Sequence, residues 1–226
     1  MKEGYFLKPI EKNEKKKEIW NDAIIQIDKI TDRLGKPIDA GIKDAVVAFI
    51  VSGFPVNGSC EGHLEERFGE KVKLRPYVMI GFDEPEQRFV NELEIKKHIA
   101  KKYNIKKVGA LEENDIAQQE YWRFLSEKDI PETPEYSEHV KKNESLQEEL
   151  RKILEVFYRN REISRDRRLI IEEIGPAGDF KLTTLMENPK EIQENEVEKY
   201  KKQSREEQNE MKDFTLFLKE RFFNKE

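Results

Sequence analysis

Apolar residues recur every three or four positions over much of the 226-residue chain. This spacing is typical of helices that bury one face. The clearest run predicts a helix over about 39–53, with Asp39 placed to cap its start and Gly53 placed to end it. Its buried face is formed by Ile42, Ala45, Val46, Phe49 and Ile50. Similar runs predict helices over about 11–34, 86–103, 143–161 and 189–223, the last of which begins at Pro189.

Shorter apolar stretches with turn residues at their ends predict four strands, over 54–57, 77–82, 169–174 and 180–185. The turn at 175–179 joins the last two strands into a hairpin. Pro76 has no amide hydrogen to donate to a strand ladder, so it fits the start of its strand or a sheet edge. The pattern therefore predicts an α+β fold, with a small mixed or antiparallel sheet of about four strands, several packed helices and a long C-terminal helix.

We expect this fold to form a single domain over 1–226, with a helical insertion at about 86–161 and a helical C-terminal extension at about 189–226. Charged residues make up 39% of the chain and hydrophobic residues 36%, below the usual apolar share of about 45–50%. The excess charge must therefore lie on solvated helices around a modest core.

The net charge of −5 disfavours a protein whose whole surface binds nucleic acid. A single cysteine rules out a framework of intramolecular disulfides. The N-terminal residues lack the apolar stretch of a secretory signal, and no run approaches the ~20 apolar residues of a membrane span. We expect a cytoplasmic protein with no membrane partner.

Functional groups gather in the loop Gly58-Ser59-Cys60-Glu61-Gly62-His63. Glycines allow backbone amides to approach a ligand, and loops at strand ends often carry sites. We therefore predict a small-molecule or nucleotide binding or catalytic site here. The candidate catalytic residues are Cys60, His63 and Glu61, and the candidate ligand-binding residues are Gly58, Ser59, Gly62 and Arg75.

Two kinds of catalysis fit the loop. A Cys60 thiolate activated by His63 would be a nucleophile. Alternatively, His63 would act as a general base while Ser59 and the glycine amides hold an anion. Arg75, just before a predicted strand, could add a guanidinium that binds phosphate or carboxylate, or it could be an ordinary surface arginine.

A metal site and a purely structural turn are the alternatives for this loop. Cys60 and His63 have a spacing found in metal sites, but a closed zinc site takes four protein ligands. With one cysteine and three histidines in the chain, carboxylates such as Glu61, Glu65 or Glu66 or an open position would be needed. We therefore expect no metal, and the sequence indicates no particular cofactor. In the structural alternative, the loop is a tight turn with a buried thiol.

Residues 35–63 and the strand that follows Pro76 resemble a group of uncharacterised bacterial proteins. These share an amphipathic helix, an SCEGH loop and a PYV-type strand, and the resemblance implies no activity. The loop is also similar to the SSCSGR loop of wybutosine-pathway tRNA methyltransferases. Ser59, Cys60 and Gly62 match that pattern, whereas His63 replaces its arginine and Gly58 its first serine. This similarity implies a further alternative, an RNA-modifying transferase that uses S-adenosylmethionine.

Two basic segments suggest a function of a different class. Residues 96–107 are rich in lysine, and residues 151–168 are rich in arginine. The alternative function is accordingly a nucleic-acid or protein interaction module that uses these segments. Apolar residues at a rough heptad spacing in the helix 189–223 also make a homodimer through the C-terminal helix possible.

Overall fold

The structure is a computed structural model that describes residues 9–31, 35–67, 70–185 and 192–224. It divides into two compact units. The first comprises residues 1–82, 145–175 and 179–226, and the second comprises residues 83–144 and 176–178. The expected helical insertion at 86–161 overlaps the second unit but extends beyond it.

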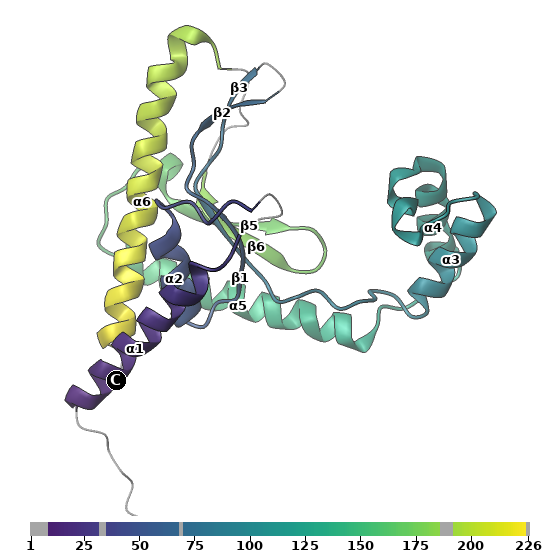
Figure 1. Cartoon of the computed structure of the whole chain (residues 1–226), viewed down its shortest axis with the longest axis horizontal. Helices are drawn as coiled ribbons and strands as arrows, with labels where there is room; N and C mark the ends of the chain where they lie inside the picture. Colours follow the sequence, from purple (N-terminus) through teal and green to yellow (C-terminus); the bar gives the residue numbers. More distant parts are fainter. Residues whose placement is uncertain (1–8, 32–34, 68–69, 186–191, 225–226) are drawn as a thin grey trace, which may run out of the picture. The chain divides into compact units, whose positions relative to one another are not determined.

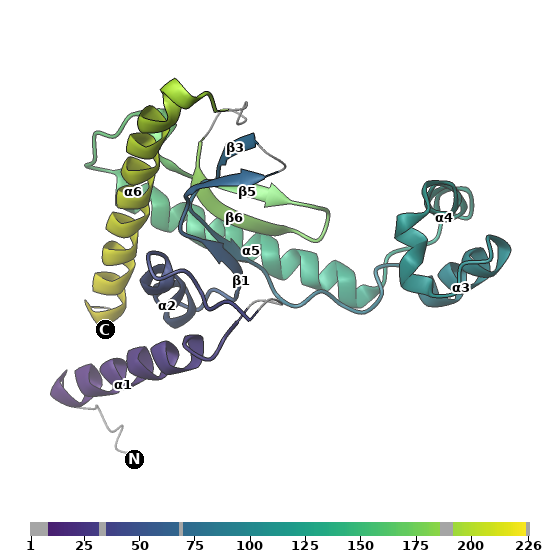
Figure 2. The same cartoon turned by 45° about the horizontal axis from the view of Figure 1, so that its top comes forward.

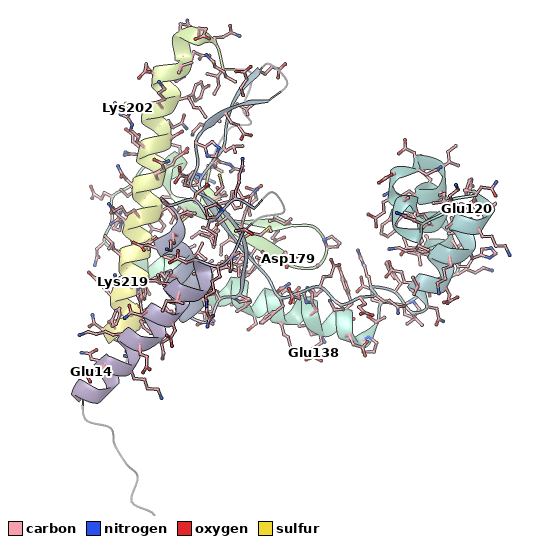
Figure 3. The ribbon with its side chains drawn as sticks, in the orientation of Figure 1. Glu14, Glu120, Glu138, Asp179, Lys202 and Lys219 are labelled. Carbon is pink, nitrogen blue, oxygen red and sulfur yellow. The ribbon has the colours of Figure 1, made fainter. Side chains whose placement is uncertain are left out.

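A four-stranded antiparallel sheet forms the centre of the first unit, which confirms the predicted α+β fold (Figure 1). Its strands are β1 (Val56–Cys60), β4 (Tyr77–Ile80), β5 (Leu169–Ile174) and β6 (Asp179–Thr184), in the order β1-β4-β6-β5. The predicted hairpin is present as β5 and β6. Asp179, labelled in Figure 3, begins β6 beside Gly81, where any side chain would overlap the Asp179 carboxylate.

A second, two-stranded sheet pairs β2 (Leu64–Arg67) with β3 (Glu70–Lys73) and was not predicted. Its sequence is almost entirely charged, so it lacks the apolar alternation that marks a half-buried strand. β2 follows β1 after only the three residues Glu61–His63. Gly58, Ser59 and Cys60 therefore belong to a strand rather than to the predicted loop.

Helices form the core of the first unit together with the sheet (Figure 2). They are α1 (Pro9–Ile27), α2 (Lys43–Val51), α6 (Val197–Asn224) and the later part of α5 (Pro134–Tyr158). Neighbouring strands place fully buried pairs on the core face, Val78 opposite Leu182 and Ile80 opposite Phe180. Across the helices, Phe214 contacts both Phe49 and Phe157. Lys219 of α6, labelled in Figure 3, lies over the ring of Trp20.

Several predicted helix boundaries were wrong. The helix expected from Asp39 begins at Lys43, and its N-cap residue Ile42 makes no side-chain capping bond. The helix expected from residue 143 begins at Pro134, where the Thr133 hydroxyl accepts a hydrogen bond from the Tyr136 amide. Proline is favoured at a first helical position, which explains why the helix can start at this residue.

The long C-terminal helix is confirmed as α6, preceded by a turn of 3₁₀ helix, η3 (Glu194–Glu196). The start predicted at Pro189 lies outside the described residues. Ser204 and Glu207 interrupt the apolar pattern of α6, yet both are buried. The apolar residues Met211, Phe214 and Leu218 pack into the core of the same chain. A homodimer through α6 therefore stays a prediction that would need other surface residues.

The second unit is helical and has a core of its own. It contains α3 (Glu92–Lys102), the 3₁₀ helix η1 (Val108–Glu113), α4 (Asp115–Glu127) and the first part of α5. Glu92 lies at its centre and accepts hydrogen bonds from the Tyr121 hydroxyl and the Phe89 amide. The core residues are Ile99, Ala100, Leu111, Ala117, Tyr121 and Leu125. Among the described residues, no helix is long and apolar enough to cross a membrane.

Candidate functional site

The turn Glu61–His63 is held in one conformation by its backbone contacts. Gly62 has a φ of 80°, and a side chain there would bring a Cβ within 2.5 Å of the Pro76 nitrogen. Only glycine satisfies both conditions. The side-chain amide of Gln208, on α6, donates a 2.6 Å hydrogen bond to the Gly62 carbonyl oxygen. The Leu74 amide donates a 2.8 Å hydrogen bond to the His63 carbonyl oxygen.

This turn brings together three side chains, those of Asp39, Cys60 and His63. One carboxylate oxygen, the sulfur and one ring nitrogen all lie within 4.8 Å of one another. Cys60 Sγ is 3.9 Å from His63 Nδ1. We call these three residues the triad. Cys60 is buried and His63 is partly exposed, so the triad lies at the surface of the fold.

Each member of the triad has a further partner. The Gly62 amide donates to Cys60 Sγ at 3.4 Å, and the Glu61 amide donates to Asp39 Oδ2 at 3.3 Å. Glu65 Oε2 lies 3.5 Å from His63 Nε2, the ring nitrogen on the side away from the thiol. Backbone amides therefore orient Asp39 and Cys60, and the Glu65 carboxylate orients the ring of His63.

Asp39 was not among the predicted site residues, and Glu61 was. The Glu61 carboxylate accepts a 2.9 Å hydrogen bond from the Gly41 amide, so it ties the segment before α2 to the turn. This contact brings Asp39 to the thiol. No local spacing relates Asp39 to Cys60, and its position before an amphipathic helix is equally typical of a cap. Only the tertiary contact identifies it.

The electrostatic surroundings raise the pKa of the Cys60 thiol. Burial is the main cause, and the Asp39, Glu61 and Glu65 carboxylates add to it, while the hydrogen bond from the Gly62 amide opposes them. Reactive cysteines need the opposite surroundings, with cations that favour the thiolate. The arrangement therefore disfavours the predicted Cys60 nucleophile, unless a cation joins the site.

A pocket of about 430 Å³ lies beside β1, between this strand and the segment that precedes α2. Gly58, Ser59 and Asp39 line it, so it includes two predicted ligand-binding residues and one member of the triad. Cys60 and His63 are not part of its wall. The rest of the wall is formed by Ile30, Thr31, Lys36, Pro37, Ile38, Val46, Ile50, Val56, Asn57 and Tyr77.

Arg75 is not part of the wall of this pocket. Its guanidinium forms a 2.8 Å ion pair with Glu172 on β5 and donates a 2.7 Å hydrogen bond to the Thr184 carbonyl oxygen on β6. Lys181 completes the cluster at 3.0 Å from Glu172. The structure thus places the predicted ligand-binding arginine where it joins β5 and β6 to the start of β4. Its predicted contact with a ligand stays a prediction.

Both basic segments are compensated only in part by ion pairs. In the lysine-rich segment, Lys96, Lys97 and Lys102 each pair with a glutamate. In the arginine-rich segment, Arg151, Arg161 and Arg167 pair with carboxylates. This second segment also borders a hollow of about 790 Å³, which we call the arginine hollow. Its wall contains one acidic residue, Glu155, together with Tyr158, apolar side chains and four arginines: Arg151, Arg159, Arg165 and Arg168. Within the described part of the chain, Arg159 and Arg165 have no ion pair or side-chain hydrogen bond.

The chain matches no family model, no curated protein and no solved structure. The function must therefore be inferred from the geometry of these sites.

Proposed function

We propose that the pocket beside β1 binds a small molecule and that the turn Glu61–His63 serves this site. The observation that carries the proposal is the composition of the pocket wall. Small-molecule sites are concave, mostly apolar and fitted with a few polar groups that orient the ligand, at volumes of roughly 300–1,000 Å³. The pocket has this composition, because polar groups of Thr31, Lys36, Asp39, Asn57 and Ser59 stand among apolar side chains in its wall.

The wall also indicates a class of ligand. Ile38, Ile50 and Tyr77 provide a surface for a flat or apolar group, while Asp39 and Ser59 accept hydrogen bonds from amino or hydroxyl groups. A nucleoside or nucleotide has both parts. S-adenosylmethionine has them too, so the RNA-modifying alternative predicts a ligand for the same pocket.

The test is to screen binding of four mononucleotides, their nucleosides and S-adenosylmethionine by ligand-observed NMR. We expect saturable binding of at least one probe by the wild-type chain. Ser59→Leu fills the pocket and should abolish this binding, whereas Ser126→Leu makes the same change at an exposed position of the second unit. Equal binding by wild type and Ser59→Leu, or no binding of any probe, would contradict the proposal. Circular dichroism of both variants checks that they fold.

The arginine hollow supports the second candidate function, binding of single-stranded nucleic acid. Such sites combine cationic side chains along the backbone with aromatic and apolar surfaces for the bases. The hollow offers Arg159 and Arg165 for phosphates and has Tyr158 and Leu154 in its wall. Because the chain as a whole is acidic, binding would be local to this hollow.

Fluorescence anisotropy with labelled single-stranded RNA and DNA tests this candidate at several salt concentrations. We expect affinity to fall as salt rises. The slope of log affinity against log salt concentration should become shallower by about 0.7 for each phosphate that a variant no longer binds. Arg159→Gln combined with Arg165→Gln should flatten the slope, whereas Lys152→Gln, on an exposed lysine that pairs with Glu148, should not. Absent or salt-independent binding would remove this candidate.

A further inference from the structure

We propose that the triad Asp39, Cys60 and His63 binds a divalent transition-metal ion of the zinc type. The proposal adds a metal ion to the proposed small-molecule site. It rests on that proposed function only for the role of the coordination position that the three protein ligands leave open. It departs from the sequence-based expectation of no metal. That expectation considered Glu61, Glu65 and Glu66 as the additional ligands and did not include Asp39.

The donor atoms indicate which ions fit. A thiolate sulfur, an imidazole nitrogen and a carboxylate oxygen together form a set that zinc binds readily. Calcium and magnesium take oxygen ligands almost throughout, so a sulfur and a nitrogen among three donors exclude them. Cobalt(II) accepts the same donors and serves as a spectroscopic substitute for zinc.

The distances leave room for one ion. Zinc bonds of about 2.0–2.3 Å place tetrahedral ligand atoms roughly 3.5 Å apart. The thiol sulfur and the imidazole nitrogen are 3.9 Å apart, and no pair of the three donor atoms exceeds 4.8 Å. Small side-chain rotations would close the remaining gap. Cys60 is the last residue of β1 and His63 ends the turn that follows it, whereas Asp39 comes from a separate segment.

The partners of the triad match the outer shell of a metal site. In such sites a histidine ligand usually faces a carboxylate or carbonyl through its second nitrogen, and the other ligands are also hydrogen-bonded. Here Glu65 lies beside His63 Nε2 while Nδ1 faces the thiol. The Gly62 and Glu61 amides donate to Cys60 and to Asp39.

The number of ligands determines what such a metal could do. Three protein ligands leave a position for water or a substrate, whereas closed structural sites have four. Asp39 belongs to the triad and also lines the pocket, so the two sites adjoin. A ligand of the pocket with an oxygen anion, such as a phosphate or carboxylate, would therefore be the class that reaches the metal.

The test is a titration of the chelator-treated full chain with cobalt(II), followed by displacement with zinc(II). We expect one equivalent to bind and to give a thiolate-to-cobalt charge-transfer band. Because the chain contains a single cysteine, only Cys60 can produce this band. Cys60→Ser should remove the band, and His63→Ala and Asp39→Asn should each weaken binding at least tenfold. Glu65→Gln, which changes only the outer shell, should weaken it about 10–100-fold.

His98→Ala is the matched control, because His98 is an exposed histidine on α3 in the second unit. It should bind cobalt like the wild type. The proposal is overturned if no charge-transfer band forms at a stoichiometric addition, or if His63→Ala and Asp39→Asn bind as tightly as the wild type. Circular dichroism verifies folding, and Asp39→Asn provides the test if Cys60→Ser does not fold.

Measurements of metal and probe binding keep this proposal separate from the proposed function. Metal binding by the wild type, without binding of any nucleotide probe, would support the triad and contradict the small-molecule pocket. Probe binding that Ser59→Leu abolishes in a chain that binds no metal would support the pocket and overturn the metal site.

Discussion

Lys73 and Glu207 form an ion pair of 2.7 Å in which both side chains are only 1% exposed. The pair joins β3 to α6 next to the residue, Gln208, that binds the Gly62 carbonyl. Burial lowers the pKa of Lys73, and the hydrogen bond from Lys73 to Glu207 opposes this effect. The β2–β3 hairpin and the turn Glu61–His63 are thus both attached to one stretch of α6.

Removing one partner of this pair should destabilise the first unit strongly. Lys73→Met leaves the buried Glu207 carboxylate without its cation, and such changes cost about 3–5 kcal/mol. The double variant Lys73→Met with Glu207→Leu should recover much of this stability, because it removes both charges. Urea unfolding followed by Trp20 fluorescence in a Trp122→Phe background measures this. A double variant no more stable than Lys73→Met would contradict this prediction. The control is Lys152→Met, which breaks an exposed ion pair and should change stability by less than about 1 kcal/mol.

Gly62→Ala should displace the turn and weaken metal binding. The positive φ alone costs about 1–3 kcal/mol for a residue with a side chain. The new Cβ would also meet the backbone of Arg75 and Pro76, which cannot move as a side chain can. Gly58→Ala is the control, since its Cβ meets only the flexible end of Met79, at 2.9 Å. Unfolding measurements and cobalt titrations test whether Gly62→Ala lowers stability and metal affinity more than Gly58→Ala does. Equal effects of the two substitutions would contradict this prediction.

In the metal-free chain, alkylation of Cys60 by iodoacetamide should rise at a higher pH than alkylation of the unfolded chain. The cause is the raised pKa of the thiol, from burial and then from the neighbouring carboxylates. The unfolded chain loses its thiol proton first, so stability from this group is present below the unfolded pKa and is lost as pH rises through the folded pKa. Asp39→Asn removes one negative charge and should lower the midpoint. A midpoint at or below that of the unfolded chain would refute this account.

Acid should destabilise the second unit through Glu92. Burial opposes the charged form, but hydrogen bonds from Lys96, the Phe89 amide and Tyr121 outweigh it and lower the pKa below 4.5. The stabilisation is present above the unfolded pKa and is lost as pH falls through the lower folded value. Trp122, whose ring contacts that of Tyr121, reports the transition by fluorescence.

Glu92→Gln should be less stable at neutral pH and should lose less stability on acidification below pH 4.5. Glu113→Gln, at an exposed position in the same unit, is expected to behave like the wild type. If Glu92→Gln and the wild type lost stability in parallel below pH 4.5, another carboxylate would control the acid transition.

Local patterns in the sequence predicted most of the fold because burial on one face is a local property of a helix or strand. They missed β2 and β3, because charged residues such as Glu65, Glu66 and Lys71 leave these strands without an apolar alternation. They also placed the start of α5 too late. The apolar pattern of the last helix also does not reveal that Ser204 and Glu207 are buried. Glu207 is buried because Lys73 neutralises it, and that partner is 134 residues away.

The candidate site was predicted only in part, for a similar reason. The sequence brought Cys60 and His63 together in one predicted loop, because only two residues separate them; in the structure Cys60 ends β1 and His63 ends the turn that follows. It could not show that the Glu61 carboxylate binds the Gly41 amide and that Asp39 therefore reaches the thiol. Arg75 was predicted to bind a ligand from its position before a strand. That position does not reveal that Glu172 and Thr184 bind its side chain.

The hydrogen bond between Gln208 and Gly62 spans 146 residues of sequence. During synthesis, the ribosome releases Asp39, Cys60 and His63 long before α6 emerges. The nascent chain thus holds every donor of the triad but not the helix that fixes their turn. The turn can be fixed only after α6 has left the ribosome and the long-range contact between Gln208 and Gly62 has closed. Until then the single thiol is exposed to the metal ions and oxidants of its surroundings.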